Sequence, residues 1–291
     1  MAEIAATVPT VFGMRIRSRA GRRLLRHRGA LIGGVLIAFF ALLAIGAPLF
    51  ASHDPMATDW MAVRKAPSLA HLMGTDEIGR DVFSRLVWGS RTSLLAGVVS
   101  VAFALTIGVP LGVIAGYAGG WVDNVISRCN EAVLSCPFLI LAIAFAAFLG
   151  PSLTNAMIAI GLSAAPIFVR LARGQTLVVK SEEYVDGARA VGLTHTRIVL
   201  RYILPNIFPP LLVQSTLTIA TAIIAEASLS FLGLGQQPPD PSWGSMLSIA
   251  KNFLVQAPWM SVWPGVAIFL VVFGFNLLGD GLRDALDPRG D

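Results

Sequence analysis

The chain has 291 residues, of which 55% are hydrophobic and only 13% are charged. A soluble domain normally carries about a quarter charged residues, so this composition excludes an ordinary soluble protein. The formal net charge of +5 needs no nucleic-acid partner, because membrane topology and anionic lipid head groups account for it.

Stretches without Asp, Glu, Lys or Arg recur along the whole chain, at residues 29–53, 92–122, 132–169, 202–225 and 252–279. Each exceeds the ~20 residues that a helix needs to cross a ~30 Å hydrocarbon core, and the longest has room for two spans around a turn at 150–155. We therefore predict an all-α, polytopic membrane protein with six transmembrane helices, at about 30–51, 92–117, 131–149, 153–172, 207–232 and 260–279.

The basic residues predict the orientation of these spans. Six crossings place both termini on one side, and sixteen of the 22 Lys and Arg residues fall on that side. Because basic residues accumulate in the cytoplasm, we expect both termini to be cytoplasmic. The predicted units are then a basic cytoplasmic tail (1–29), a first transmembrane helix (30–51), an extracytoplasmic loop (52–91) and a five-helix core (92–291).

Two segments near the second and third spans support further predictions. Residues 79–91 have an apolar and a charged face, which favours a helix on the outer membrane surface with Trp88 at head-group depth. A simple lead-in to the second span is the alternative. Cys129 and Cys136 flank the start of the third span, and we expect two inert, buried thiols there.

Between the fourth and fifth spans lies a polar stretch, SEEYVDGARAVGLTHTRIVLRYILPN, at residues 181–206. Ser181 is a good N-cap, and Gly192 suits the left-handed position that ends a helix. Thr194 can cap a second helix, which Pro205 is expected to break before the fifth span. The pattern predicts a cytoplasmic helix–turn–helix, either a docking element for another protein or a capped loop without a partner.

The fifth span carries a stripe of small and polar residues at helical spacing: Gln214, Thr218, Thr221, Ala225 and Ser228. This stripe either lines a translocation path or allows close helix packing. Glu226 is the one clear ionisable residue within the spans, and it is either a proton-relay group or a structural group paired across a helix interface. In the loop at 236–251, prolines predict an extended path with Trp243 exposed or interfacial.

The sequence contains no recognisable catalytic or metal-binding motif. No lysine follows a glycine, which excludes a G-x-x-x-x-G-K-[ST] phosphate loop, and neither H-E-x-x-H nor G-x-S-x-G occurs. The four histidines, His27, His53, His71 and His195, are scattered without metal-ligand spacing. We therefore predict no catalytic residue, no metal site and no enzymatic activity in this chain.

The 181–206 loop also resembles a known family. The pattern D-G-A-x-x-x-G at 186–192, followed by I-x-L-x-x-x-L-P-N at 198–206, is similar to the "EAA" loop of ABC-importer permease subunits. Asp186 and Gly187 stand where that family has Glu and Ala, and a glycine inside a helix costs up to ~1 kcal/mol relative to alanine. MGTDEIGRDVFSRLVWGSRTSL, EASLSFLGLGQQPPDPSWGSML and NLLGDGLRDALDPR, at 73–94, 226–247 and 276–289, resemble in particular the C-type permease subunit of dipeptide, oligopeptide and nickel importers.

This resemblance, which covers about 71–289, implies a multi-pass permease of the bacterial cytoplasmic membrane that translocates dipeptides or oligopeptides. The implied partners are a homologous permease in a heterodimer, two ATPase subunits that bind ATP and Mg, and an extracytoplasmic substrate-binding protein. The chain itself would hold no cofactor.

Three sets of residues are expected to carry this function. The loop that couples to the ATPase would use Asp186, Gly187, Ala188, Gly192, Leu193, Thr194, His195 and Arg197. The translocation path would use Gln214, Thr218, Thr221, Glu226 and Ser228. The binding protein would dock near Pro238, Pro239 and Trp243. Two other functions remain as alternatives: a nickel importer and, in another class, an ion-coupled secondary transporter that uses Glu226. A non-transporting membrane receptor is a third alternative.

Overall fold

The structure is a computed structural model that describes residues 21, 23–25 and 27–286. Most of the basic tail predicted at 1–29 and the last residues of the 276–289 motif lie outside this range. Every regular element among the described residues is helical, and they contain no β-strand. The prediction of an all-α fold is confirmed.

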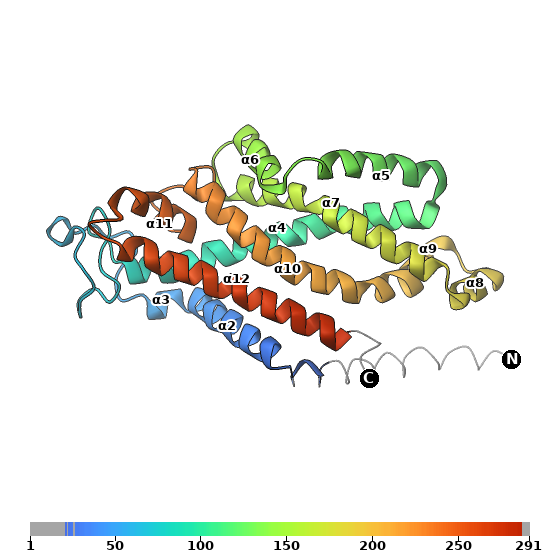
Figure 1. Cartoon of the computed structure of the whole chain (residues 1–291), viewed down its shortest axis with the longest axis horizontal. Helices are drawn as coiled ribbons and strands as arrows, with labels where there is room; N and C mark the ends of the chain where they lie inside the picture. The colour runs from blue at the N-terminus through green and yellow to red at the C-terminus, as the bar shows by residue number, and fades with distance from the viewer. Residues whose placement is uncertain (1–20, 22, 26, 287–291) are drawn as a thin grey trace.

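The long helices run back and forth along one bundle (Figure 1). They are α2 (Arg28–Ile45), α4 (Val82–Ala118), the pair α5 (Gly120–Leu134) and α6 (Phe138–Leu149), α7 (Leu153–Lys180), α10 (Leu204–Phe231) and α12 (Trp259–Leu286). Short helices connect them: α3 (Ala47–Phe50), α8 (Glu183–Ala190), α9 (His195–Ile198) and α11 (Trp243–Ala250), with single turns at Trp60–Ala62, Val199–Ile203 and Lys251–Phe253. In the described chain five segments are long and apolar enough to cross a membrane, and the α5–α6 pair makes a sixth if it is one span.

The two ends of the bundle differ in what they carry. Figure 1 shows α8 at one end, and α11 with the loop that precedes α4 at the other; we call these the α8 end and the α11 end. The start of α2 and the finish of α12 lie together, because His27 Nε2 is 3.2 Å from Asp284 Oδ2. An even number of crossings would place these two ends on the same side of the membrane.

The centre of the bundle is the long contact between α4 and α7. Three glycines of α4 at spacings of four face α7, and a β-carbon on Gly108 or Gly116 would lie 2.7 Å or 2.8 Å from a backbone carbonyl oxygen of α7. Small residues at such spacing let two helix backbones approach closely, which is a main source of helix association in lipid.

The separate surface helix predicted at 79–91 is wrong, because α4 is continuous from Val82 to Ala118. Asp81 caps its first turn by accepting a hydrogen bond from the Ser84 N–H, and Pro110 is the first proline inside the helix. Nothing near residue 91 interrupts the backbone hydrogen bonds, so the lead-in and the second span form one element.

The third span is also different from the straight helix predicted at 131–149. α5 and α6 meet at 90°, because Pro137 at the N-cap of α6 cannot donate a backbone hydrogen bond to continue α5. All fifteen residues of α5 are described and none of them is buried. Cys129 and Cys136 are accordingly exposed, so the prediction of buried thiols is wrong.

Pro205 does not break the helix that enters the fifth span. The chain is helical from His195 to Phe231, with a π-helical turn at Val199–Ile203 directly before the proline. Local π-helical adjustments satisfy the backbone groups that a proline would otherwise leave unpaired, so the helix continues. As a consequence, the 181–206 loop leads without interruption into α10.

Candidate functional site

The α8–α9 unit, residues 182–198, is the helix–turn–helix predicted from the sequence. Gly192 has φ +77°, its N–H donates to the Arg189 carbonyl at 2.9 Å, and the Leu193 N–H donates to the Ala188 carbonyl at 3.2 Å. These two bonds form the Schellman motif expected at a glycine-terminated helix. The N-cap of α8 is Glu182, one residue after the predicted Ser181, which instead ends α7.

The α8–α9 unit has a buried side and an exposed side. Val185, Ala188 and Ile198 are buried and belong to the hydrophobic core of the bundle. Leu193 is half-buried against the same core. The other predicted coupling residues are all exposed: Asp186, Gly187, Gly192, Thr194, His195 and Arg197. The unit is therefore anchored on one face and presents the other outward.

Polar contacts tie this unit to the ends of the two central helices. The Tyr117 hydroxyl, at the end of α4, lies 2.8 Å from Nδ1 of His195. Lys180, the last residue of α7, donates from Nζ to the Tyr117 carbonyl at 2.6 Å and lies 5.5 Å from the centre of its ring. These contacts join α9 to the end of α4, and the end of α4 to the end of α7. Neither Tyr117 nor Lys180 could be predicted from a local motif, since their partners lie 78 and 63 residues away in the chain.

The exposed side of the unit is also hollowed and partly apolar. A shallow depression of about 450 Å³ is lined by Thr194, Thr196, Arg197, Leu200 and Arg201. Leu200 in its lining is 61% exposed, and Val191, at the end of α8, is 76% exposed. Exposed apolar side chains next to a concave, basic surface are typical of a protein-docking site.

The stripe predicted along the fifth span divides between exposed and buried positions on α10. Thr221 is exposed and Gln214 and Ser228 are half-buried, whereas Thr218 and Glu226 are buried. The hydroxyls of Thr221 and Ser228 donate to carbonyls of their own helix at 3.1 Å and 2.8 Å.

Glu226 is wholly buried within a hydroxyl network that joins three helices. Ser230 on α10 donates to one carboxyl oxygen at 2.7 Å and Ser93 on α4 donates to the other at 3.1 Å. The backbone N–H of Trp243, at the start of α11, in turn donates to the Ser93 hydroxyl at 3.3 Å. Of the two roles considered for Glu226, this arrangement favours the structural one.

An apolar groove runs between α4 and α10 on the outside of the bundle. It encloses about 770 Å³ and is lined by residues that include Leu105, Val109, Pro110, Phe208, Leu212 and Ser215. Phe208 is 60% exposed in this groove. Because its lining is almost entirely apolar, this groove is a surface that either lipid or another helical chain must cover.

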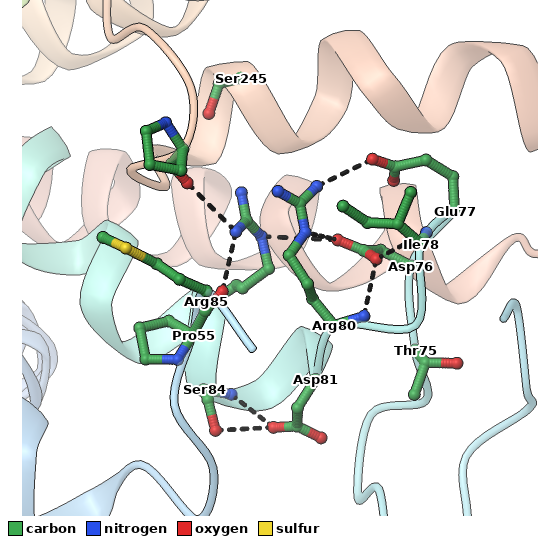
Figure 2. Close-up of polar contacts among 12 residues, drawn as sticks. Pro55, Thr75, Asp76, Glu77, Ile78, Arg80, Asp81, Ser84, Arg85 and Ser245 are labelled. Atoms are coloured by element: carbon green, nitrogen blue, oxygen red, sulfur yellow. Dashed lines mark hydrogen bonds and ion pairs between the residues drawn. The ribbon is translucent and has the colours of Figure 1, made fainter. Parts of the chain in front are cut away.

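At the α11 end, the stretch DEIGRD at 76–81 forms a buried charge network that was not predicted from the sequence. Figure 2 shows Arg80 between two carboxylates: Nε donates to Asp76 at 2.6 Å and Nη2 donates to Glu77 at 2.8 Å. Arg85 reaches across to the carbonyls of Pro55 and Pro239, at 2.9 Å and 3.4 Å. The network therefore ties the 51–81 loop, the start of α4 and the 236–242 loop together.

The predicted docking residues at this end have different environments. Pro238 and Pro239 are exposed, whereas Trp243 is fully buried, so the prediction of an exposed or interfacial Trp243 is wrong. Its ring packs edge-on against Phe40 at 5.6 Å, and its Nε1 donates to the Leu86 carbonyl at 3.1 Å. Residues 243–250 form α11 instead of an extended loop.

A bundle of apolar crossings with an anchored, outward-facing helix–turn–helix at one end defines the chain as a multi-pass membrane permease. The chain belongs to the family of binding-protein-dependent transport system inner membrane components, whose model matches residues 108–290. A second model, the N-terminal TM domain of oligopeptide transport permease C, matches residues 17–67. The resemblance inferred from the loop motifs is therefore confirmed.

Curated relatives support the same assignment. The dipeptide transport system permease protein DppC of Alkalihalophilus pseudofirmus is 47% identical, covering 93% of this chain and 89% of that protein. The probable D,D-dipeptide transport system permease protein DdpC of Escherichia coli is 48% identical over 88% and 86% of the two chains. The glutathione transport system permease protein GsiD of Pectobacterium atrosepticum is 41% identical over 98% and 96%.

Among solved structures, the fold is similar to the inward-facing MetNI methionine ABC transporter, with a TM-score of 0.56 and 24% identity over 69% of this chain and 95% of that one. The chain is thus a permease subunit of an ABC importer, and such subunits are not enzymes.

Proposed function

We propose that this permease imports dipeptides or similarly short peptides, such as glutathione, across the bacterial cytoplasmic membrane. The support is the identity of 41% to 48% to permeases named for dipeptide, D,D-dipeptide and glutathione transport, over nearly the whole chain. The names of these relatives favour a peptide over nickel as the cargo.

In this proposal the α8–α9 unit couples peptide import to ATP hydrolysis in two partner subunits, which would hold the ATP and Mg. The observation that carries this assignment is that the unit is rigidly capped, exposed on one face and bonded through His195 and Tyr117 to α4. Because coupling requires that two docked states differ in energy, an element that moves as a unit transmits more of that difference than a soft loop would.

The remaining partners fit other surfaces of the bundle. A homologous permease covers the groove between α4 and α10, and the exposed part of the α10 stripe then faces the translocation path. A substrate-loaded binding protein docks at the α11 end, where Pro238 and Pro239 are exposed on a loop that Arg85 holds in place. The charge distribution predicts that this end is extracytoplasmic.

Transport by the reassembled complex tests the proposal. The chain is reconstituted in liposomes with its partner permease, ATPase subunits and binding protein, and uptake of a labelled dipeptide is measured. We expect uptake that needs ATP and is competed by glutathione but not by Ni²⁺. Uptake driven by a proton gradient without ATP would contradict the assignment and support the ion-coupled alternative. Competition by Ni²⁺ with no competition by peptides would support the nickel importer.

Tyr117→Phe tests the coupling path within the same assay. The substitution removes the hydroxyl that contacts His195 and leaves the ring beside Lys180. We expect ATP hydrolysis to persist while less peptide is imported per ATP. Val178→Ala, which shortens a 59% exposed side chain of α7, is a control that should leave the ratio unchanged.

A further inference from the structure

Two histidines converge on one carboxylate at the α11 end. His53 follows α3, His71 lies in the loop before α4, and Asp81 is the N-cap of α4. Nδ1 of His71 lies 3.0 Å from Oδ1 of Asp81, and Nδ1 of His53 lies 3.9 Å from the same oxygen. The two imidazole rings are adjacent, with their centres 4.9 Å apart.

The surroundings of Asp81 orient this oxygen toward the histidines. Its other oxygen, Oδ2, accepts from the backbone N–H and the hydroxyl of Ser84, at 2.8 Å and 2.7 Å (Figure 2). The same Ser84 hydroxyl accepts from the His53 N–H at 3.1 Å, which fixes the backbone of that histidine. Hydrogen bonds that hold a carboxylate and its neighbours in this way are the usual outer shell of a metal site.

We propose that His53, His71 and Asp81 form a binding site for a first-row divalent cation of the Zn²⁺ type. Two imidazole nitrogens and one carboxylate oxygen are ligands that Zn²⁺ accepts, and three protein ligands leave one position open for water or a bound molecule. This site is independent of the proposed peptide transport.

The distances are compatible with this cation after a small closure. The three ligand atoms lie within 4.8 Å of one another. Ligands about 2.0–2.1 Å from a shared tetrahedral ion lie roughly 3.4 Å apart, so no pair of these atoms has to approach by more than about 1.4 Å. The His53 side chain is 42% exposed, whereas Asp81 is 1% exposed and held by Ser84. The Ser52 hydroxyl, 3.0 Å from Nδ1 of His53, must give way to the cation.

A bound cation would join three segments that the sequence separates. It would fasten the 51–81 loop to the first turn of α4, next to the charge network of Arg80 and Arg85. The proposed cation site lies at the α11 end, and His53 is its exposed ligand.

Direct metal binding by the purified full-length chain tests the site. The protein is prepared in detergent without a polyhistidine tag, stripped of metal, and dialysed against Zn²⁺. We expect one equivalent of Zn²⁺ that raises the melting temperature, and a visible absorption spectrum for bound Co²⁺ that Zn²⁺ abolishes. His53→Ala and Asp81→Asn should each weaken Zn²⁺ binding about tenfold or more; asparagine still serves as the N-cap of α4.

Matched variants separate the site from general binding to histidine. His27 and His195 lie at the α8 end, so His27→Ala and His195→Ala should bind Zn²⁺ as the unaltered chain does. Because His53 is partly exposed, we expect His53→Ala to fold normally. The melting temperature of His53→Ala without metal checks that it does. Absence of a stoichiometric site in the unaltered chain, or equal affinity in His53→Ala, would overturn the proposal.

Discussion

Gly192 offers the sharpest test of the coupling role of the α8–α9 unit. Its φ of +77° lies in the left-handed region, where a side chain with a β-carbon costs roughly 1–2 kcal/mol and a β-branched one costs more. A β-carbon at this position would meet no atom within 4 Å. The cost of Gly192→Ala or Gly192→Val is therefore backbone strain alone, without a steric clash.

Gly187, five residues before Gly192 and within α8, provides a matched control. It also has open space around a β-carbon, but it lies inside α8 and its φ is not positive. Gly187→Ala should therefore stabilise α8 by up to ~1 kcal/mol, since alanine is the better helix former. The same chemical change at Gly187 and Gly192 is expected to differ by about 2–3 kcal/mol in its effect on the loop.

The assay is ATP-driven peptide uptake by the reconstituted complex, with membrane insertion measured in parallel. We expect Gly192→Val to insert normally and to lose uptake, because the turn can no longer hold α8 and α9 in register. Gly192→Asn should retain part of the activity, since asparagine tolerates a positive φ. Gly187→Ala should transport as well as the unaltered chain. Undiminished uptake by Gly192→Val would refute the reasoning.

Three further predictions concern buried polar groups. Arg80→Ala leaves Asp76 and Glu77 without their buried cation and should lower the free energy of unfolding by about 3–5 kcal/mol. Arg128→Ala, in an exposed ion pair, is the control and should change the free energy of unfolding by less than about 1 kcal/mol, as measured for both variants by chemical denaturation. Glu226→Gln keeps one acceptor oxygen and offers an amide N–H to the second serine hydroxyl, which can turn to accept it, so ATP-driven uptake should persist. Glu226→Leu leaves two hydroxyls without this partner, at about 1–3 kcal/mol each. Loss of uptake in a stably folded Glu226→Gln would instead support the ion-coupled transporter. Burial, and then the neighbouring Asp76 charge, raises the pKa of Glu77 above its ordinary value near 4.5. Its protonated form therefore stabilises the fold at low pH, and this contribution is lost as the pH rises through the raised pKa. The melting temperature of the unaltered chain relative to Glu77→Gln should fall between pH 4 and pH 7, and a constant difference would contradict this.

The sequence determined the parts of this protein that depend on local chemistry. Charge-free runs identify the membrane crossings because an uncompensated charge in hydrocarbon is costly wherever it occurs. Gly192 predicts its own turn, because the left-handed conformation and the two bonds that close the helix involve only residues 188–193. The loop motifs were equally readable, since they lie on contiguous stretches of chain.

Only the tertiary structure decided which distant side chains meet. Trp243 looks like an exposed loop residue until α11 packs its ring against Phe40 and beside Gly89, where a larger side chain would leave little room. His53 and His71 appear scattered because they have no metal-ligand spacing in the sequence, and only the folded loop brings both to one carboxylate oxygen of Asp81. Local patterns record the hydrogen bonding and burial period of each helix, whereas contacts between segments depend on how the helices pack.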